Sequence, residues 1–479
     1  MLDPKDWQRF REQAHAMLDS AIDDIATIRE RNVWQPVPLD VQAALSQAPL
    51  PRNATPLEDV HADFQRLIAP YATGNRHPRF FGWVHGGGTP SGMLAEMLAA
   101  SINSNTGGRD HAATYVERGV IRWWADIFGF PADSSGIVTS GTSVATLDAL
   151  LVARTHALGS DVRSTGVGEK RLVGYAGRNV HHCLSNAFDI SGLGTSALRL
   201  IPTDASGSLD TALLEARIQA DRAAGFTPFF LSATIGSVDT GASDDLPALA
   251  ACARQHGLWL HVDGAFGALA ILSERHRHFL RGIELADSLA FDFHKWLQVP
   301  YGAGLMLTPH RQTHFQTFAD KAAYLARQQQ GTAGGDPWFC DFGIELSRRF
   351  RALSVWFTMR EFGLERLGQV VTMNCTLAEE LGERIAALPN FELLAPVRLN
   401  IVCARYNDGA SDPLELNQIN EALAIRLQLS GEVVASTTRI DGNLALRFNF
   451  TNHRITSDDL DRVLTALITA SVNPKEPLK

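Results

Sequence analysis

The sequence predicts an α/β protein whose central sheet is largely parallel. Between about residues 90 and 310, short β-rich runs alternate with helical ones. Helical stretches such as 143–158 and 246–257 lie between several of these runs. Functional residues of such sheets gather at the carboxyl ends of the strands. The expected strands are 171–177, 196–202, 229–236, 258–266, 288–293 and 303–308.

Smaller units are expected on either side of this region. An N-terminal helix is predicted, because Asp3 and Pro4 offer an N-cap and an N1 proline before an apolar stripe. The Gln- and Gly-rich stretch 324–342 shows no periodicity and fits either a surface connection or a mobile lid. The expected division is an N-terminal helical segment at 1–85, a large domain at 86–350 and a small α+β domain at 351–479.

The bulk properties exclude several classes of protein. The chain has 479 residues and a net charge of −9, which argues against nucleic acid or an anionic membrane as its main partner. No run approaches the roughly 18 apolar residues of a membrane span, and the polar N-terminus does not predict a secretory signal. The five cysteines lack a CxxC spacing, so we expect buried, reduced thiols in a cytoplasmic protein and no metal site.

The stretch from 136 to 151 has a chemical interpretation. A strand ends in the hydroxyl-rich run 139–143, and a helix starts at once. The N–H groups of a helix N-terminus, with the hydroxyls of Thr142 and Ser143 beside them, suit a phosphate group. The alternative is an ordinary capped helix.

A carboxylate and a lysine follow two later strands. Asp263 ends an almost wholly apolar strand, where a carboxylate is costly without a cation or donor. Lys295 follows the next strand between Phe293 and Trp296, and apolar surroundings disfavour its charged form. A pyridoxal phosphate enzyme needs this set: the lysine bonds to the cofactor aldehyde, the aspartate charges the ring nitrogen, and small Ala265 leaves room for the ring. Otherwise Asp263 is a helix cap or half of a structural ion pair.

These motifs resemble a known family. HVDGAFG followed by DSLAFDFHKW, and preceded by PFFLSATIGSVDTGASDDL, is similar to the group II pyridoxal phosphate-dependent amino-acid decarboxylases over nearly the whole chain. The resemblance implies the fold-type I architecture of pyridoxal phosphate enzymes and a homodimer with a swapped N-terminal segment. It implies decarboxylation of an L-amino acid, with an aromatic one favoured, to the amine and CO2.

The resemblance also implies roles for individual residues. His181 matches the histidine that stacks on the cofactor ring, although its neighbour His182 leaves the choice open. Tyr324 matches a loop tyrosine that protonates the α-carbon after CO2 leaves. The residues that match other positions around the cofactor are Thr142, Ser143, Thr234 and His294.

Two departures from the family leave questions open. Asp292 stands where the animal aromatic enzymes carry Asn near the phosphate, and a second negative charge there is unfavourable. The expected substrate pocket, with Trp83, Val84, Asn105 and Arg109, offers fewer aromatic side chains than those enzymes. A smaller, acidic or polar substrate of the glutamate, aspartate or diaminobutyrate type, or an aldehyde synthase reaction, is therefore an alternative. A cofactor-free structural protein with the same fold is an alternative of another class.

Overall fold

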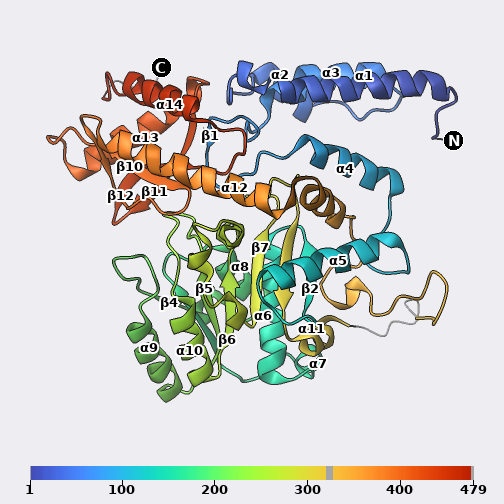
Figure 1. Cartoon of the computed structure of the whole chain (residues 1–479), viewed down its shortest axis with the longest axis vertical. Coiled ribbons are helices and arrows are strands. Elements are labelled where there is room, and N and C mark those ends of the chain that lie inside the picture. Colours follow the sequence, from blue (N-terminus) through green and yellow to red (C-terminus); the bar gives the residue numbers. More distant parts are fainter. Residues whose placement is uncertain (1, 320–326, 476–479) are drawn as a thin grey trace. The chain divides into compact units, whose positions relative to one another are not determined.

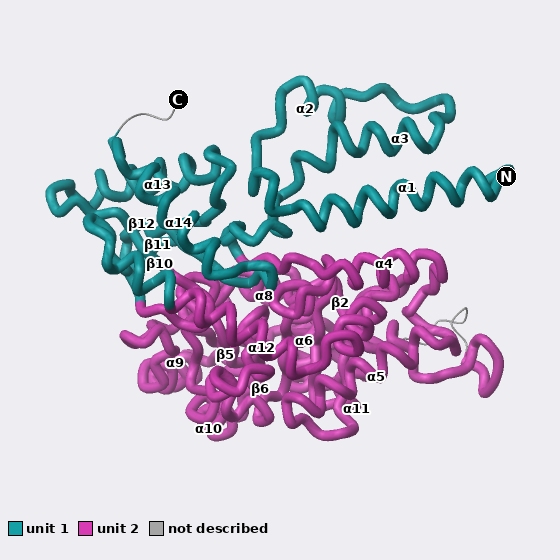
Figure 2. The backbone as a smooth tube through the Cα atoms, turned by 45° about the horizontal axis from the view of Figure 1, so that its top comes forward, with its two compact units in different colours: residues 1–83, 380–395, 403–479 teal, residues 84–379, 396–402 magenta. Residues whose placement is uncertain are grey.

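The computed structural model describes residues 2–319 and 327–475. The chain divides into two compact units, residues 1–83, 380–395 and 403–479 forming unit 1 and residues 84–379 and 396–402 forming unit 2 (Figure 2). The helices are α1 (Trp7–Ala26), α2 (Leu39–Ser46), α3 (Leu57–Asp63), α4 (Pro90–Ile102), α5 (Ala112–Ile127), α6 (Thr142–Leu158), α7 (Val162–Thr165), α8 (Cys183–Ile190), α9 (Thr211–Ala223), α10 (Leu246–His256), α11 (Arg311–Phe318), α12 (Ala352–Ala386), α13 (Pro413–Leu429) and α14 (Ser457–Ala470).

Unit 2 is built on a seven-stranded sheet. Its strands are β2 (Ser135–Thr139), β3 (Leu172–Gly177), β4 (Leu198–Ile201), β5 (Thr227–Thr234), β6 (Trp259–Asp263), β7 (Ser288–Asp292) and β8 (Gly304–Thr308), in the order β2-β8-β7-β6-β5-β3-β4. Strands β3 to β7 pair in parallel, and β8 is antiparallel to both β7 and β2. The predicted α/β class and its largely parallel sheet are confirmed.

The strands of this sheet are apolar runs because helices cover them. Every residue of β2, β3, β6 and β7 is buried, as expected for a parallel sheet with two covered faces. Helix α6 packs over β7 and β8, and α9 and α10 lie side by side next to β5 (Figure 1). Helix α10 begins at the N-cap Asp245, which accepts the Ala248 N–H, and ends at Gly257 in the left-handed conformation.

Unit 1 contains a second sheet, in the order β1-β11-β12-β10-β9. Its strands are β1 (Phe80–Phe81), β9 (Phe391–Leu393), β10 (Ile401–Tyr406), β11 (Val434–Ile440) and β12 (Asn443–Asn449). Strand β1 pairs in parallel with β11, so the N-terminal segment adds a strand to a sheet made by the C-terminal part of the chain.

The N-terminal helix starts later than predicted. Helix α1 begins at Trp7 and is capped by Asp6, whose Oδ1 accepts the N–H groups of Gln8 and Arg9. The predicted cap at Asp3 was wrong, because Asp6 satisfies the free N–H groups of the first turn. No residue of α1 is buried within the chain. In residues 2–319 and 327–475, no helix combines the length and the apolar character needed to cross a membrane.

Candidate active site

The sheet of unit 2 brings the predicted residues to one edge. Strands β5, β6 and β7 are parallel neighbours, so their carboxyl ends lie together. Thr234 and Asp263 are paired in the register of β5 and β6, and Asp292 is the last residue of β7. Strand β8 lies between β7 and β2, with Gly304 opposite both Asp292 and Thr139. The start of α6 and the Lys295 loop therefore lie on either side of Gly304.

Lys295 and the start of α6 meet at Asp292. The Lys295 Nζ lies 2.8 Å from Asp292 Oδ2, and the lysine side chain is 20% exposed. The Thr142 N–H donates to Asp292 Oδ1 at 2.6 Å. Asp292 is buried, and it places its charge where the dipole of α6 favours an anion. Asp292 was expected only as a departure near the phosphate, and its contact with Lys295 was not predicted, although their i,i+3 spacing allowed one.

Glycine is required beside this contact. A Cβ on Gly304 would lie 2.7 Å from Asp292 Oδ1 and 2.8 Å from the Gly141 Cα. A Cβ on Gly86 would lie 2.3 and 2.4 Å from the carbonyl oxygens of His294 and Lys295. Side chains at these positions would force the loops apart, so the absent Cβ atoms allow the close approach. The approach of Gly86 to the Lys295 loop was not predicted.

Asp263 is a buried carboxylate with one described donor. It is 4% exposed, and the Ala265 N–H donates to its Oδ1 at 3.1 Å. Burial raises the pKa of Asp263, and the nearby Lys295 charge opposes the rise. Among the described residues it forms no salt bridge, and the N-caps of the neighbouring helix α10 and 3-10 turn 267–272 are Asp245 and Phe266. Within residues 2–319 and 327–475, Asp263 therefore neither caps a helix nor forms an ion pair within 4 Å.

The two adjacent histidines differ in their surroundings. His181 is half-buried, whereas His182 is exposed. Burial lowers the pKa of His181 to about 4, helped by the charges of His182 and Lys295, so its ring is neutral near pH 7. The Cys183 N–H donates to His181 Nδ1 at 3.2 Å, which leaves the proton of the neutral ring on Nε2. The role of His181 as the ring-stacking residue stays a prediction.

His294 is held in the loop that carries Lys295. The Ala303 N–H donates to His294 Nδ1 at 3.1 Å, and Nε2 lies 3.8 Å from Asp292 Oδ2. Burial lowers the pKa of His294. Its ring centroid lies 4.4 Å from that of Tyr301, which in turn lies 5.8 Å from that of His85. Tyr301 was not among the predicted residues, because nothing in its sequence context distinguishes it from a loop tyrosine.

The predicted substrate residues have structural contacts of their own. The Asn105 Oδ1 accepts the N–H groups of Gly107 and Arg348. The Arg109 guanidinium lies 4.4 Å from the centre of the Trp338 ring. Val84 is buried in unit 2, and Trp83, 55% exposed, is the last residue of the first segment of unit 1.

Tyr324 lies outside the described residues. Its predicted role as proton donor therefore stays a prediction.

The residues at this edge fit pyridoxal phosphate. The Thr142 Oγ1 is buried at the start of α6 without a hydrogen-bond partner, which suits a phosphate oxygen. Ser143, in the same turn, is exposed. The Lys295 amine provides the group that bonds to the aldehyde, and the buried Asp263 carboxylate suits the ring nitrogen.

Three comparisons with known proteins agree with this chemistry. A family model described as the pyridoxal-dependent decarboxylase conserved domain matches residues 38–407. An aromatic-L-amino-acid decarboxylase of Bacillus atrophaeus is 30% identical over 461 residues, which cover 95% of this chain and 94% of that protein.

Two solved structures are similar over nearly the whole chain. One is the Catharanthus roseus tryptophan decarboxylase in complex with L-tryptophan, with a TM-score of 0.87 and 26% identity over 98% of this chain and 99% of the other. The other is the glutamate decarboxylase domain of a Vibrio parahaemolyticus diaminobutyrate-pyruvate transaminase and L-2,4-diaminobutyrate decarboxylase. It has a TM-score of 0.86 and 26% identity, with 98% and 97% of the two chains covered.

Proposed function

Because the chain belongs to the pyridoxal-dependent decarboxylase family and decarboxylates an amino acid with pyridoxal phosphate, we propose that its substrate is an aromatic L-amino acid. The products are then the aromatic amine and CO2. The names of the Bacillus and Catharanthus proteins support an aromatic substrate. The observation that carries the proposal is the single sheet edge at which Asp263, Lys295 and the start of α6 meet.

Each residue has a defined task in this proposal. When bound, pyridoxal phosphate withdraws electrons from the substrate α-carbon, which weakens the bond to the carboxylate. Thr142 and Ser143 bind the phosphate, and His294 and Thr234 contact the cofactor. Lys295 would hold the cofactor through its amine, the group that can bond to the aldehyde.

The remaining residues act on the ring and on the α-carbon. Asp263 holds the proton on the ring nitrogen, and Ala265 gives the ring room. His181 stacks on the ring as a neutral imidazole, in keeping with its lowered pKa. Tyr324 donates a proton to the α-carbon after CO2 leaves.

A smaller or acidic substrate is the second candidate. Arg109 is an exposed cation next to the predicted pocket, and a guanidinium binds a second carboxylate well. The similarity to the Vibrio protein supports the same alternative. In this case the side-chain carboxylate of the substrate binds the Arg109 guanidinium.

Assembly and location complete the proposal. Helix α1 exposes Trp7, Phe10 and Ile22, which are 60%, 38% and 44% exposed, and a second copy of the chain would cover them. We infer a homodimer in which the N-terminal segment packs on the partner. In the described part of the chain none of the five cysteines forms a disulfide, which favours a reducing compartment such as the cytoplasm.

A substrate screen tests the proposal. The purified protein, loaded with pyridoxal phosphate, would be incubated with each of the twenty standard amino acids, ornithine and diaminobutyrate. Release of CO2, amine and aldehyde would be measured in the same reactions. Fastest turnover of an aromatic amino acid to its amine is expected. Fastest turnover of glutamate, aspartate or diaminobutyrate would establish the second candidate, and aldehyde as the main product would establish an aldehyde synthase.

A further inference from the structure

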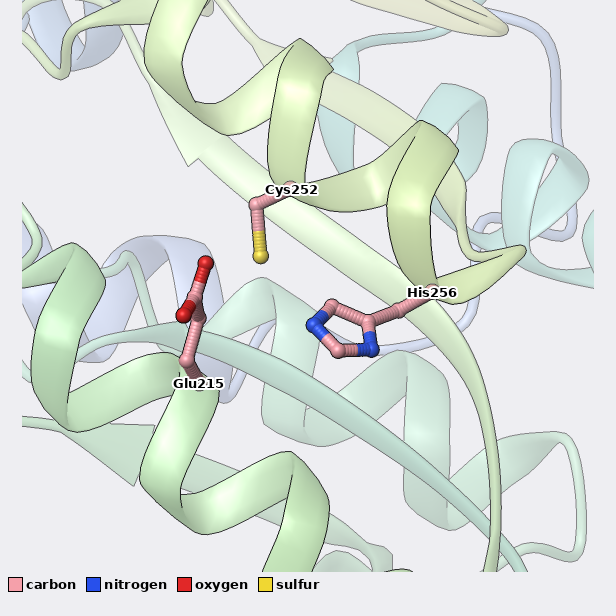
Figure 3. A group of neighbouring side chains, drawn as sticks. All are labelled: Glu215, Cys252 and His256. Atoms are coloured by element: carbon pink, nitrogen blue, oxygen red, sulfur yellow. The ribbon is translucent and has the colours of Figure 1, made fainter.

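Three potential metal ligands meet between α9 and α10, away from the residues described above. Glu215 projects from α9, and Cys252 and His256 project from one face of α10, four residues apart. Figure 3 shows the three side chains pointing toward one another from the two helices. Their ligand atoms, a carboxylate oxygen, Sγ and an imidazole nitrogen, all lie within 4.8 Å of one another.

This cluster lies near the amino ends of the parallel strands, whereas Lys295 lies near their carboxyl ends. Helix α10 follows the carboxyl end of β5 and ends at His256, three residues before β6 begins at Trp259. His256 is therefore near the amino end of β6, whereas Asp263 is at its carboxyl end. The pyridoxal phosphate reaction does not use these three residues.

The three side chains have few protein partners. The Nε2 of His256 is buried and has no hydrogen-bond partner. Cys252 is a free thiol that is 4% exposed. Glu215, half-buried, forms no salt bridge within the described part of the chain. A buried nitrogen without a partner is costly, so a ligand in this space would satisfy it.

We propose that Glu215, Cys252 and His256 bind one divalent transition metal ion of the Zn²⁺ class, with water as the fourth ligand. One thiolate, one imidazole and one carboxylate suit a borderline-soft ion better than Mg²⁺ or Ca²⁺, which prefer oxygen ligands. The ion joins α9 to α10. Burial, assisted by the Glu215 charge, raises the pKa of the Cys252 thiol to about 11, so metal binding releases the thiol proton to solvent.

The hydrogen bonds between Arg222 and His256 disfavour metal binding. Its Nη1 lies 3.1 Å from His256 Nδ1, and its Nη2 donates to the His256 carbonyl oxygen at 2.7 Å. Because a guanidinium only donates, Nδ1 accepts and the ring proton is on Nε2. A metal ion on Nε2 moves that proton to Nδ1, and the exposed Arg222 Nη1 must then withdraw. An acceptor in place of Arg222 would instead stabilise the metal-bound ring.

Zinc binding to the pyridoxal phosphate-loaded enzyme tests the proposal. Equilibrium dialysis should find one Zn²⁺ per chain that Glu215→Gln and His256→Gln each weaken by at least about tenfold. Arg222→Gln should tighten binding by about tenfold, because its amide oxygen accepts the Nδ1 proton. Zinc should also raise the melting temperature of the parent and not that of Glu215→Gln. Cys403→Ser, which changes a buried cysteine of unit 1 that forms no disulfide, is the matched control and should bind as the parent does.

X-ray absorption at the zinc edge gives a second measurement. The bound ion should show one sulfur at about 2.3 Å among nitrogen and oxygen ligands at about 2.0 Å, and Cys252→Ser should remove the sulfur. Glu215 is half-buried, so its variant folds even if Cys252→Ser does not. Equal zinc affinity in the parent, Glu215→Gln and His256→Gln, or no binding by the parent, would overturn the proposal.

Discussion

The Lys295 Nζ lies 2.8 Å from Asp292 Oδ2, and the other oxygen of the same carboxylate accepts the Thr142 N–H. One buried side chain thus contacts both the lysine that we propose bonds to the cofactor aldehyde and the helix N-terminus that we propose for its phosphate. Asp292 neutralises the Lys295 ammonium when no cofactor is bound. In the proposed site the phosphate would lie near this carboxylate, and like charges repel.

Replacing Asp292 with Asn should tighten cofactor binding. The Asn amide oxygen still accepts the Thr142 N–H, so the loop keeps its geometry, but the charge beside the phosphate is removed. We expect the dissociation constant of pyridoxal phosphate to fall about tenfold, or about 1.4 kcal/mol, in a titration of cofactor-free protein followed by absorbance.

Asp287→Asn is the control for net charge. Asp287 directly precedes β7 at its other end and accepts the Leu260 N–H. The Asp287→Asn variant should bind the cofactor with the affinity of the parent. If Asp292→Asn binds the cofactor more weakly than the parent and Asp287→Asn do, the carboxylate favours cofactor binding rather than opposing it.

Lys295→Ala should abolish turnover without preventing cofactor binding. The phosphate contacts at the start of α6 and the Asp263 contact remain, while the amine that bonds to the aldehyde is gone. Absorbance should show bound, unlinked pyridoxal phosphate, and gel filtration should leave it on the protein. Retention of near-parental turnover would assign the linkage to another lysine.

Asp263→Asn should bind the cofactor and lose most of the activity. The amide has nearly the same shape as the carboxylate but cannot hold a proton on the ring nitrogen by charge. We expect kcat to fall at least a hundredfold, which corresponds to about 2.7 kcal/mol of transition-state stabilisation. Asp245→Asn, at the N-cap of α10, is a matched control on an exposed carboxylate, and its kcat should stay within a few fold of the parent. If kcat of Asp263→Asn falls only twofold, Asp263 is not a catalytic residue.

Tyr324→Phe should change the product rather than the binding of substrate. The phenyl ring keeps the size of the side chain and removes its proton. The α-carbon then lacks its donor after CO2 leaves, and O2 oxidises it to give aldehyde, ammonia and hydrogen peroxide. Amine and aldehyde would be quantified from one reaction. Amine at the parental rate, with no aldehyde, would show that the proton comes from another group.

The stability of the protein should fall in mild acid because of buried histidines. His261 and His314 are fully buried, and burial lowers the pKa of each from 6.5 to about 3. The unfolded chain binds a proton at each histidine below about pH 6.5, whereas the folded chain does not. The free energy of unfolding therefore decreases as the pH falls from 6.5 toward 3, by up to about 1.4 kcal/mol per pH unit for each histidine.

A single variant isolates this effect. His261→Gln should lower the pH slope of the free energy of unfolding by up to about 1.4 kcal/mol per unit between pH 6 and 4, measured by urea denaturation. His15→Gln, on the exposed face of α1, should leave the slope unchanged. An unchanged slope in His261→Gln would mean that His261 is protonated in the folded protein.

Local patterns predicted the strands of unit 2, because most of their residues are apolar and buried. Strand β11 was not predicted, because polar residues such as Thr437 and Thr438 obscure the alternation of apolar and polar residues that indicates a strand. The antiparallel direction of β8 was also not predicted, since it depends on which strands meet in space. The order of Asp263, one strand and Lys295 predicted residues of the candidate site, but the contact of Asp292 with Lys295 and the close approach of Gly86 required the three-dimensional structure.

The position of β8 also bears on how the protein is made. Strand β2 gains its partner only when residues 304–308 are available, because β8 is its neighbour in the sheet. A ribosome must therefore synthesise the chain beyond Thr308 before the start of α6 can settle beside the Lys295 loop. Contacts so distant in sequence form slowly. The nascent chain should be unable to retain pyridoxal phosphate until this late pairing, and arrested chains that end before and after β8 would differ in cofactor capture.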